Sequence, residues 1–112
     1  MIAKDLLDYL NSTLTDPVYM EQPEETFGYV LLDQTGTSTV NHITTTTIAV
    51  QSYGKTLYEA MILNEAVKVA MEGFAELGNV ASVKLETDYN FTNTATKQYR
   101  WQAVYDITHY NN

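Results

Sequence analysis

The chain of 112 residues contains no cysteine. Disulfide bridges, thiolate metal sites and a cysteine nucleophile are therefore excluded. Long apolar runs are also lacking, because no stretch reaches the ~18 apolar residues that a membrane-spanning helix needs. The opening MIAKDLLDYL carries acids inside its apolar run, unlike a signal peptide. We therefore expect a protein that does not enter a membrane and is made in the cytoplasm of its cell.

Basic residues are scarce, and the first half of the chain has almost none. Residues 5–54 contain no Lys or Arg but hold seven acids: Asp5, Asp8, Asp16, Glu21, Glu24, Glu25 and Asp33. Proteins that grip nucleic acid need clustered Lys and Arg to displace counterions, so phosphate binding is not expected. The net charge of −8 indicates either a solvated, soluble surface or a surface that repels DNA or meets a basic partner.

Motifs for catalysis and cofactor binding are missing as well. The two histidines, His42 and His109, lie far apart in strand-like segments, and neither has a metal-ligand spacing around it. No serine lies in a Gly-x-Ser-x-Gly turn, and the five glycines are scattered rather than gathered into a phosphate loop. The acids of residues 21–25 lack the alternating spacing of a calcium loop. We predict that the chain is not an enzyme and has no catalytic, cofactor-binding or metal-binding residues.

The hydrophobic pattern predicts seven elements in one domain that spans residues 1–112. Helices are expected at residues 2–14 and 55–77, where apolar residues recur at helical spacing. Strands are expected at residues 18–21, 27–33, 39–52, 80–91 and 97–110, and QTGT follows the second of them as a turn. The order α-β-β-β-α-β-β indicates an α+β fold, with a mainly antiparallel sheet of four to five strands and two helices packed on one face.

Four consecutive threonines, at positions 44 to 47, lie in the third expected strand. β-branched residues favour strands, and a glycan-bearing stalk would want prolines that this segment lacks. In a strand, Thr44 and Thr46 share the face of Ile48 and Val50, while the other two threonines lie on the opposite face. The threonines dilute both faces, which is typical of a long strand that a core covers only in part.

The helix expected at residues 55–77 is unusually apolar. Its apolar sector is roughly 200° wide, against the ~100° that suffices for a helix packed on one sheet. This excess predicts that the helix is covered on more than one side, either by the N-terminal helix or by another subunit.

The two C-terminal strands alternate apolar and polar residues and are joined by the loop TNTAT. A hairpin centred on Thr94 places Asp88 opposite Arg100, and Leu85 opposite Ala103. A one-residue slip would turn the apolar side chains outward, so registers that differ by one are excluded. The Asp88–Arg100 pair is therefore predicted to set the hairpin register.

The chain holds nine tyrosines, a residue type that is enriched at protein interfaces. Three strand tyrosines are expected to line the small sheet core: Tyr89, Tyr99 and Tyr105. Others lie at the corner between the long strand and the second helix, or near the C-terminus. The residues predicted at an interface, either with another copy of the chain or with a different partner protein, are Tyr53, Tyr58, Met61 and Tyr110.

Two segments resemble the tail terminator and minor capsid proteins of long-tailed bacteriophages and prophages of Gram-positive bacteria. They are IAVQSYGKTLYEAMILNEAVKVAM (48–71) and DYNFTNTATKQYRWQAVYDITHY (88–110). The similarity covers residues 40–110, including the strand–SYG–helix corner and the final aromatic hairpin. It is a similarity of the whole domain and brings no catalytic residue with it.

The resemblance implies a structural virion protein that forms a ring, commonly a hexamer, on the head-proximal end of the tail tube. The ring ends tube polymerisation and joins tail to head, and DNA passes through its lumen without specific binding. The implied partners are further copies of the chain, the tail tube protein and the head connector or neck protein. The implied location is the virion tail, after synthesis in the bacterial cytoplasm. The predicted DNA-repelling surface consists of Glu21, Glu24, Glu25 and Asp33.

Two alternatives stay open. Another neck role in the same phages, such as a head-completion or adaptor protein, fits the same length and fold class. A small ligand-binding or enzyme domain with an aromatic-lined pocket belongs to a different class. A deep pocket with convergent polar groups would favour this last alternative, and a flat, aromatic-rimmed subunit surface would oppose it.

Overall fold

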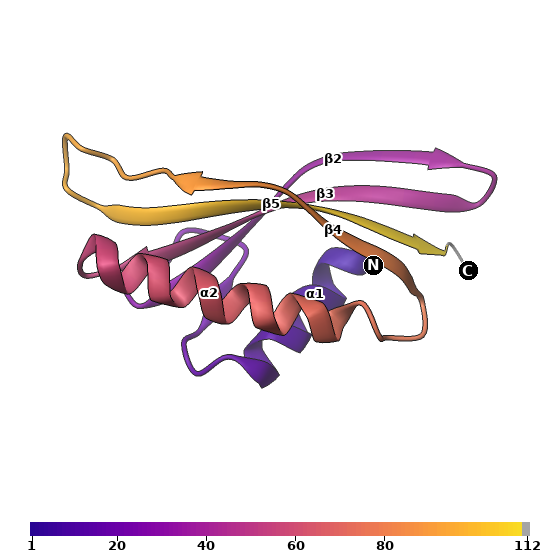
Figure 1. The fold of residues 1–112 in the computed structure, drawn as a ribbon, viewed down its shortest axis with the longest axis horizontal. Helices are drawn as coiled ribbons and strands as arrows, with labels where there is room; N and C mark the ends of the chain where they lie inside the picture. The colour runs from indigo at the N-terminus through magenta and orange to yellow at the C-terminus, as the bar shows by residue number, and fades with distance from the viewer. Residues whose placement is uncertain (111–112) are drawn as a thin grey trace.

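The computed structural model describes residues 1–110, so the last two residues of the predicted domain lie outside the described part. Two helices and five strands follow the expected order (Figure 1). The elements are α1 (Ile2–Thr13), β1 (Val18–Tyr19), β2 (Tyr29–Val40), β3 (Ile43–Gly54), α2 (Leu57–Phe74), β4 (Val80–Asn90) and β5 (Tyr99–Tyr110). The predicted α+β class is confirmed. The molecule is elongated, with principal extents of 44 × 25 × 22 Å.

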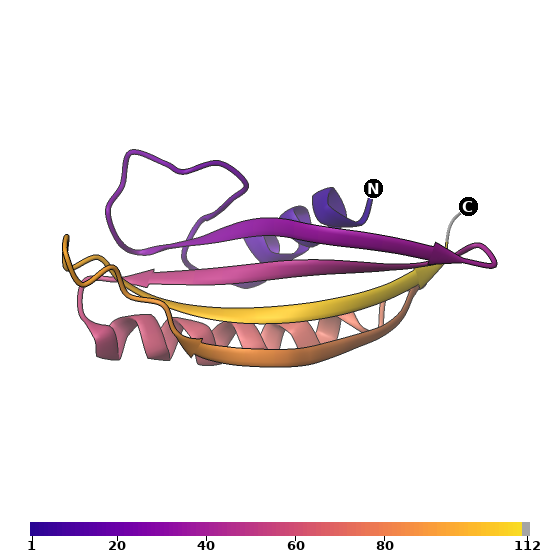
Figure 2. The ribbon, with the colours of Figure 1, turned by 90° about the horizontal axis from the view of Figure 1, so that it is seen from above.

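The strands form one sheet in the order β1-β2-β3-β5-β4 (Figure 2). β1 pairs with β2 in parallel, and every other pairing is antiparallel. Both helices lie on the same face of the sheet, as predicted (Figure 1). The sheet extends past the ends of the helices, because β2 and β3 form a long hairpin whose turn lies far from the helical layer.

The turn between β2 and β3 differs from the prediction. QTGT is not a turn, because β2 runs through it and absorbs the irregularity as a bulge between Gln34 and Gly36. The chain reverses instead at Asn41 and His42, whose φ angles are 52° and 67°. Two successive residues with positive φ are what a two-residue type I′ hairpin turn requires, and asparagine tolerates this region best among non-glycine residues.

The four threonines lie in β3 and divide between the two faces as predicted. Thr44 and Thr46 are buried on the helix side, together with the core residues Ile48 and Val50. The hydroxyl of Thr46 lies 3.0 Å from Nε2 of His109, which is also buried. Thr45 and Thr47 are half-buried on the other face of the strand.

The predicted register of the β4–β5 hairpin is wrong. Asp88 lies opposite Ala103, not Arg100, and Leu85 lies opposite Tyr105. The turn is bracketed by a bridge between residues 93 and 98, and β4 contains bulges between residues 80 and 82 and between 85 and 87. A bulge adds one residue to one strand and reverses which positions face the core. Leu85 and Asp88 therefore both face the helices, although strict alternation separates them.

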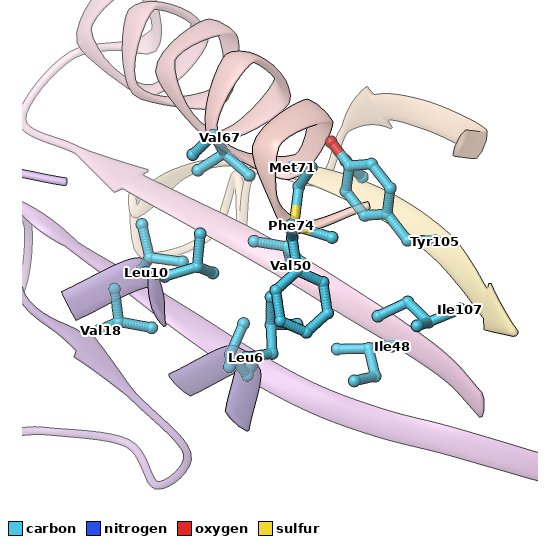
Figure 3. Packing of buried hydrophobic residues seen from close by; sticks show 14 of the residues in the cluster. Leu6, Leu10, Val18, Ile48, Val50, Val67, Met71, Phe74, Tyr105 and Ile107 are labelled. Atoms are coloured by element: carbon cyan, nitrogen blue, oxygen red, sulfur yellow. The ribbon is translucent and has the colours of Figure 1, made fainter. Parts of the chain in front are cut away.

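The core lies between the helices and the sheet. Leu6 and Leu10 of α1 and Val67 and Phe74 of α2 are fully buried against the strands. Figure 3 shows these side chains converging on the sheet residues Ile48, Val50, Tyr105 and Ile107.

Helix α2 begins with a reciprocal cap. The hydroxyl of Thr56 accepts a hydrogen bond from the Glu59 N–H at 3.1 Å, and the Glu59 carboxylate accepts one from the Lys55 N–H at 3.1 Å. The first bond satisfies a backbone donor of the first turn that has no helical partner, and the second satisfies the backbone donor of the residue before the cap. The cap explains why the helix begins at Leu57, two residues later than predicted.

The second helix is covered on more than one side, as its wide apolar sector predicted. Tyr9 of α1 donates a hydrogen bond to the Ala70 carbonyl at 2.7 Å, and its ring centroid lies 5.3 Å from that of Phe74. Gly73 makes this contact possible, since a Cβ at that position would collide with the Tyr9 hydroxyl. Even so, α1 leaves part of the apolar sector of α2 uncovered.

Candidate functional site

The described residues, 1–110, hold no group of three metal-ligating side chains. In the same part of the chain, no helix combines the length and apolar character needed to cross a bilayer. The features that stand out are instead two exposed apolar surfaces, one at each end of the long axis, and a groove beside β4.

The first surface is a row of three side chains, Val40, Ile43 and Tyr110, which we call the apolar tip. The sheet register pairs Val40 with Ile43 across the β2–β3 turn and Ile43 with Tyr110 across β3 and β5. Paired residues point to the same face, so the three side chains form a continuous strip. Each is between 41% and 68% exposed. The tip lies at the end of the molecule that projects beyond both helices (Figure 1).

The second surface, which we call the α2 groove, lies at the opposite end. It has a volume of about 480 Å³ and runs between the N-terminal half of α2 and the segments that precede β1 and β2. Phe27, Tyr58 and Ile62 supply its exposed apolar lining, and each is between 47% and 71% exposed. Leu63 and Ala66 extend the lining along the helix. Large exposed apolar side chains gathered in this way mark sites of contact with another molecule.

The third feature is a groove of about 400 Å³ between α2 and β4, which we call the β4 groove. Its apolar lining includes Met71, Val83 and Leu85, and Lys68 also lines it. Tyr105 lines it as well, and burial raises the pKa of its phenol well above the usual range. The hydroxyl of Tyr105 is buried without a hydrogen-bond partner among the described residues. The groove thus combines an apolar lining with one unsatisfied polar group.

Tyr53, one of the predicted interface residues, is buried inside the chain. Its side chain is 1% exposed and stacks on Tyr29 with ring centroids 4.3 Å apart. Its hydroxyl donates to Gln51 at 2.8 Å and accepts from Arg100 at 3.2 Å. Burial, helped by the neighbouring Tyr53, raises the pKa of Tyr29 to about 12. These aromatic rings stabilise the face of the sheet that the helices leave open.

The other predicted interface residues are exposed. Tyr58 lines the α2 groove, Tyr110 belongs to the apolar tip, and Met61 lies on α2 outside both surfaces. The structure therefore does not bring Tyr58 and Tyr110 together in one copy: they lie at opposite ends of the domain (Figure 1).

Asp88 and Arg100, predicted as partners, have separate roles. Asp88 accepts a hydrogen bond from the Trp101 indole at 2.7 Å and forms an ion pair with Lys68 at 3.1 Å. The indole bond, followed by Lys68, lowers the pKa of Asp88. Arg100 instead donates to the Phe91 carbonyl at 2.6 Å and lies over that ring. Asp88 thereby ties the edge strand β4 to α2, while Arg100 holds the loop end of the hairpin.

The four acids of the predicted DNA-repelling surface are all exposed. Glu21, Glu24 and Glu25 share the loop between β1 and β2, where Glu25 accepts a hydrogen bond from the Tyr19 hydroxyl at 3.1 Å. Asp33 lies apart from them, in β2. Whether these acids face DNA stays a prediction.

The sequence reasoning missed the apolar tip and most of the α2 groove. Val40 and Ile43 were expected inside one strand, so their position on either side of a turn was not anticipated. The available signal was the Asn41–His42 pair between two β-branched residues. Ile62 lies within the helix predicted at residues 55–77, for which no surface contact of this residue was predicted.

A scan of the chain against protein-family models gave no match, and a search among curated proteins gave none either.

Proposed function

We propose that the chain is a structural virion protein: a ring subunit that caps the tail tube of a long-tailed phage and forms the head–tail joining surface. The observation that carries the proposal is the pair of different apolar surfaces at opposite ends of one elongated domain. A chain with two different contact surfaces associates head to tail, and such contacts form rings when the rotation between copies closes.

Two further observations support this proposal. The segments 48–71 and 88–110, which resemble tail terminator proteins, form the strand–helix corner beside the α2 groove and the hairpin that crosses the sheet. The net charge of −8 and the exposed acids of the β1–β2 loop suit a lumen through which DNA passes without binding. The partners would be further copies, the tail tube protein and the head connector.

Native mass spectrometry of the chain, alone and with tail tubes of the phage that encodes it, tests this function. We expect a ring, commonly of six copies, either free or formed on the tube end, and tubes that stop growing once it is added. A chain that stays monomeric and binds no tube would contradict the proposal. Binding to the head connector without binding to tubes would instead favour another neck role, such as an adaptor.

The β4 groove supports a second candidate, a small ligand-binding domain. A ligand with an apolar body and one hydrogen-bonding group would cover Val83 and Leu85 and satisfy the Tyr105 hydroxyl. Leu85→Trp would place a larger side chain in this groove. Small molecules that raise the melting temperature of the wild type but not of this variant would favour ligand binding. If no compound in an apolar fragment set does so, the tail function is favoured.

A further inference from the structure

We infer that the outer edge of β4, together with the β4 groove, binds an extended segment of a partner protein in which apolar residues alternate with basic ones. The segment would add a strand to the sheet beside β4 and place its apolar side chains in the groove. This inference does not rest on the proposed tail function, and it gives the β4 groove a peptide as its occupant in place of a small ligand.

The edge of β4 supplies the backbone groups for such a strand. β4 is the last strand of the sheet, so no strand within residues 1–110 pairs with its outer side (Figure 2). Apart from Val80, its residues are exposed or half-buried. In an antiparallel pair, every second residue points its N–H and C=O away from the neighbouring strand. A free edge of this kind binds extended segments through main-chain hydrogen bonds.

The bulges of β4 determine where a strand can be added. They lie between residues 80 and 82 and between residues 85 and 87, and the segment 82–85 between them pairs with β5 without interruption. Bulges blunt an edge strand against unspecific pairing, because they bend and twist the edge. We therefore place the partner along residues 82–85, where a short segment pairs in regular register.

The β4 groove lies beside the same four residues. Val83 and Leu85 line it from β4, and Met71 lines it from α2. Side chains that alternate along an added strand point to this side at every second position, and the volume of about 400 Å³ accommodates them. The outer half of β2 is the other open edge of the sheet, but its end projects beyond both helices (Figure 1). β4 therefore combines backbone pairing with a groove that selects side chains.

A polar group in the groove also favours a peptide. The Tyr105 hydroxyl is buried and has no hydrogen-bond partner among the described residues. Burial, followed by the carboxylates of Asp88 and Glu65, raises the pKa of this phenol, so it stays protonated and can donate a hydrogen bond. The amide groups of a peptide carry carbonyl oxygens that accept such bonds. A carbonyl that reaches this hydroxyl would remove the cost of burying it unpaired.

The charges on both sides of the groove select a basic segment. Residues 65–88 contain five acids and two lysines, which gives this segment a net charge of −3. Lys68, the cation in the groove lining, already pairs with two carboxylates. Glu72, which also lines the groove, and Glu76 form no ion pair within residues 1–110. Lys or Arg of an incoming strand therefore finds unpaired carboxylates, whereas an acidic strand is repelled.

Peptides of about seven residues test this binding, because in extended form they span the regular segment of β4. The probes are fluorescently labelled peptides that alternate lysine with one apolar residue, either valine, isoleucine, leucine or phenylalanine. We expect fluorescence anisotropy to give a dissociation constant of about 1–100 μM for at least one of them. Counterparts with glutamate in place of lysine should bind about tenfold or more weakly. Basic peptides that bind no more tightly than their acidic counterparts would overturn the inference.

Methylation of the peptide backbone separates strand addition from simple filling of the groove. Only every second N–H of the peptide faces β4, so methylation of that alternate set should weaken binding about tenfold or more. Methylation of the other set should have little effect. Amide hydrogen exchange in the complex should slow at residues 82–85 but not in the outer half of β2. Binding that survives both methylation patterns would assign the groove to a small apolar ligand and overturn the inference.

Two pairs of matched variants locate the site. Leu85→Trp should weaken binding about tenfold or more, whereas Leu77→Trp, at a residue that is equally exposed but outside the groove lining, should bind like the wild type. Glu72→Lys should weaken binding of the basic peptides about threefold or more. Glu21→Lys in the β1–β2 loop makes the same change in net charge and should have less effect. Circular dichroism shows that the variants fold, and equal effects within either pair would contradict binding at β4.

The tail-tube assay keeps this inference separate from the proposed function. If the wild type binds the basic peptides but binds neither tail tubes nor the head connector, the inference stands and the tail function fails. If the wild type caps tubes but binds none of the peptides, the tail function stands and the inference fails.

Discussion

The two long hairpins of the sheet point to opposite ends of the molecule and differ in almost every respect (Figure 1). The β2–β3 hairpin reverses in two residues, carries no charge from Gln34 onward and ends in exposed apolar side chains. The β4–β5 hairpin has a longer loop and two bulges, and its charged residues Asp88 and Arg100 contact Lys68 of α2 and Tyr53 of β3.

The two hairpins differ in how far contacts within one copy pair their charged groups and bury their apolar side chains. Asp88 and Arg100 find partners within their own copy, so the β4–β5 hairpin is held by internal contacts. The apolar strip at the end of the β2–β3 hairpin is only partly covered by the residues that the structure describes, 1–110. An exposed apolar strip on an uncharged projection is a liability unless another molecule covers it.

The largest expected effect comes from comparing two isoleucines. Ile107→Ala, in the core, should lower the free energy of unfolding by about 2–4 kcal/mol, because it removes buried methyl groups and leaves a cavity. Ile43→Ala, at the tip, should change it by less than about 0.5 kcal/mol, because Ile43 is exposed. Urea denaturation of the monomer measures both. An equal loss at Ile43 would show that the tip packs within its own chain.

The next effect concerns Asp88, whose ion pair with Lys68 joins β4 to α2. Asp88→Ala should lower the free energy of unfolding by about 1–3 kcal/mol, because Trp101 and Lys68 lose their shared acceptor. Glu86→Ala on the same strand removes only the exposed pair with Lys84 and should cost less than about 0.5 kcal/mol.

The contribution of Asp88 also depends on pH. Its pKa in the folded chain is below the ordinary value of 3.8, so its stabilisation is fully present above pH 3.8. That stabilisation is lost as the pH falls through the folded-state pKa. The gap between wild type and Asp88→Ala should therefore narrow at acid pH, and a gap that stays constant would show that the carboxylate charge is not involved.

A smaller effect is expected at His109, which lies beside Thr46 of β3. Burial lowers the pKa of His109, so between that value and the ordinary 6.5 the unfolded chain binds more protons than the folded chain. The free energy of unfolding should therefore fall as the pH drops below 6.5. His109→Gln should flatten this slope, whereas His42→Gln in the exposed turn should keep it. Unfolding curves at several pH values distinguish the two variants.

The smallest effect lies in the β2–β3 turn. His42→Gly should raise the free energy of unfolding by about 0.5 kcal/mol, because a non-glycine residue with a φ of 67° is strained and Asn-Gly is the preferred pair for this turn. Thermal melts measure the gain. A loss of stability instead would show that the His42 side chain makes a contact that holds the tip.

Most of the fold followed from the hydrophobic pattern. Helical spacing predicted both helices, and strand patterning predicted all five strands and their order, since these signals are local. The hydrophobic pattern did not predict the strand registers of the two hairpins. The bulge between Leu85 and Thr87 leaves no trace in the alternation, and Gly36 looked like a turn although it pairs with Thr47 inside the sheet.

The candidate surfaces were predicted only in part. Tyr58 and Tyr110 were expected at an interface because tyrosine is common there, and both are exposed. Tyr53 was expected there for the same reason, yet it stacks on Tyr29, a contact across two strands that depends on the β2–β3 register. The apolar tip could not be predicted without the position of the β2–β3 turn, because the turn places Val40, Ile43 and Tyr110 in one row.

A cysteine cross-link tests most directly whether copies associate head to tail through the apolar tip and the α2 groove. The chain has no native cysteine, so Ile43→Cys and Tyr58→Cys introduce single thiols. Mixing these two variants under mild oxidation should give mixed disulfide dimers in clear excess over either homodimer. Ile43→Cys mixed with Val69→Cys should not. Equal cross-linking to Tyr58 and Val69, or none to Tyr58, would contradict head-to-tail association through these two surfaces.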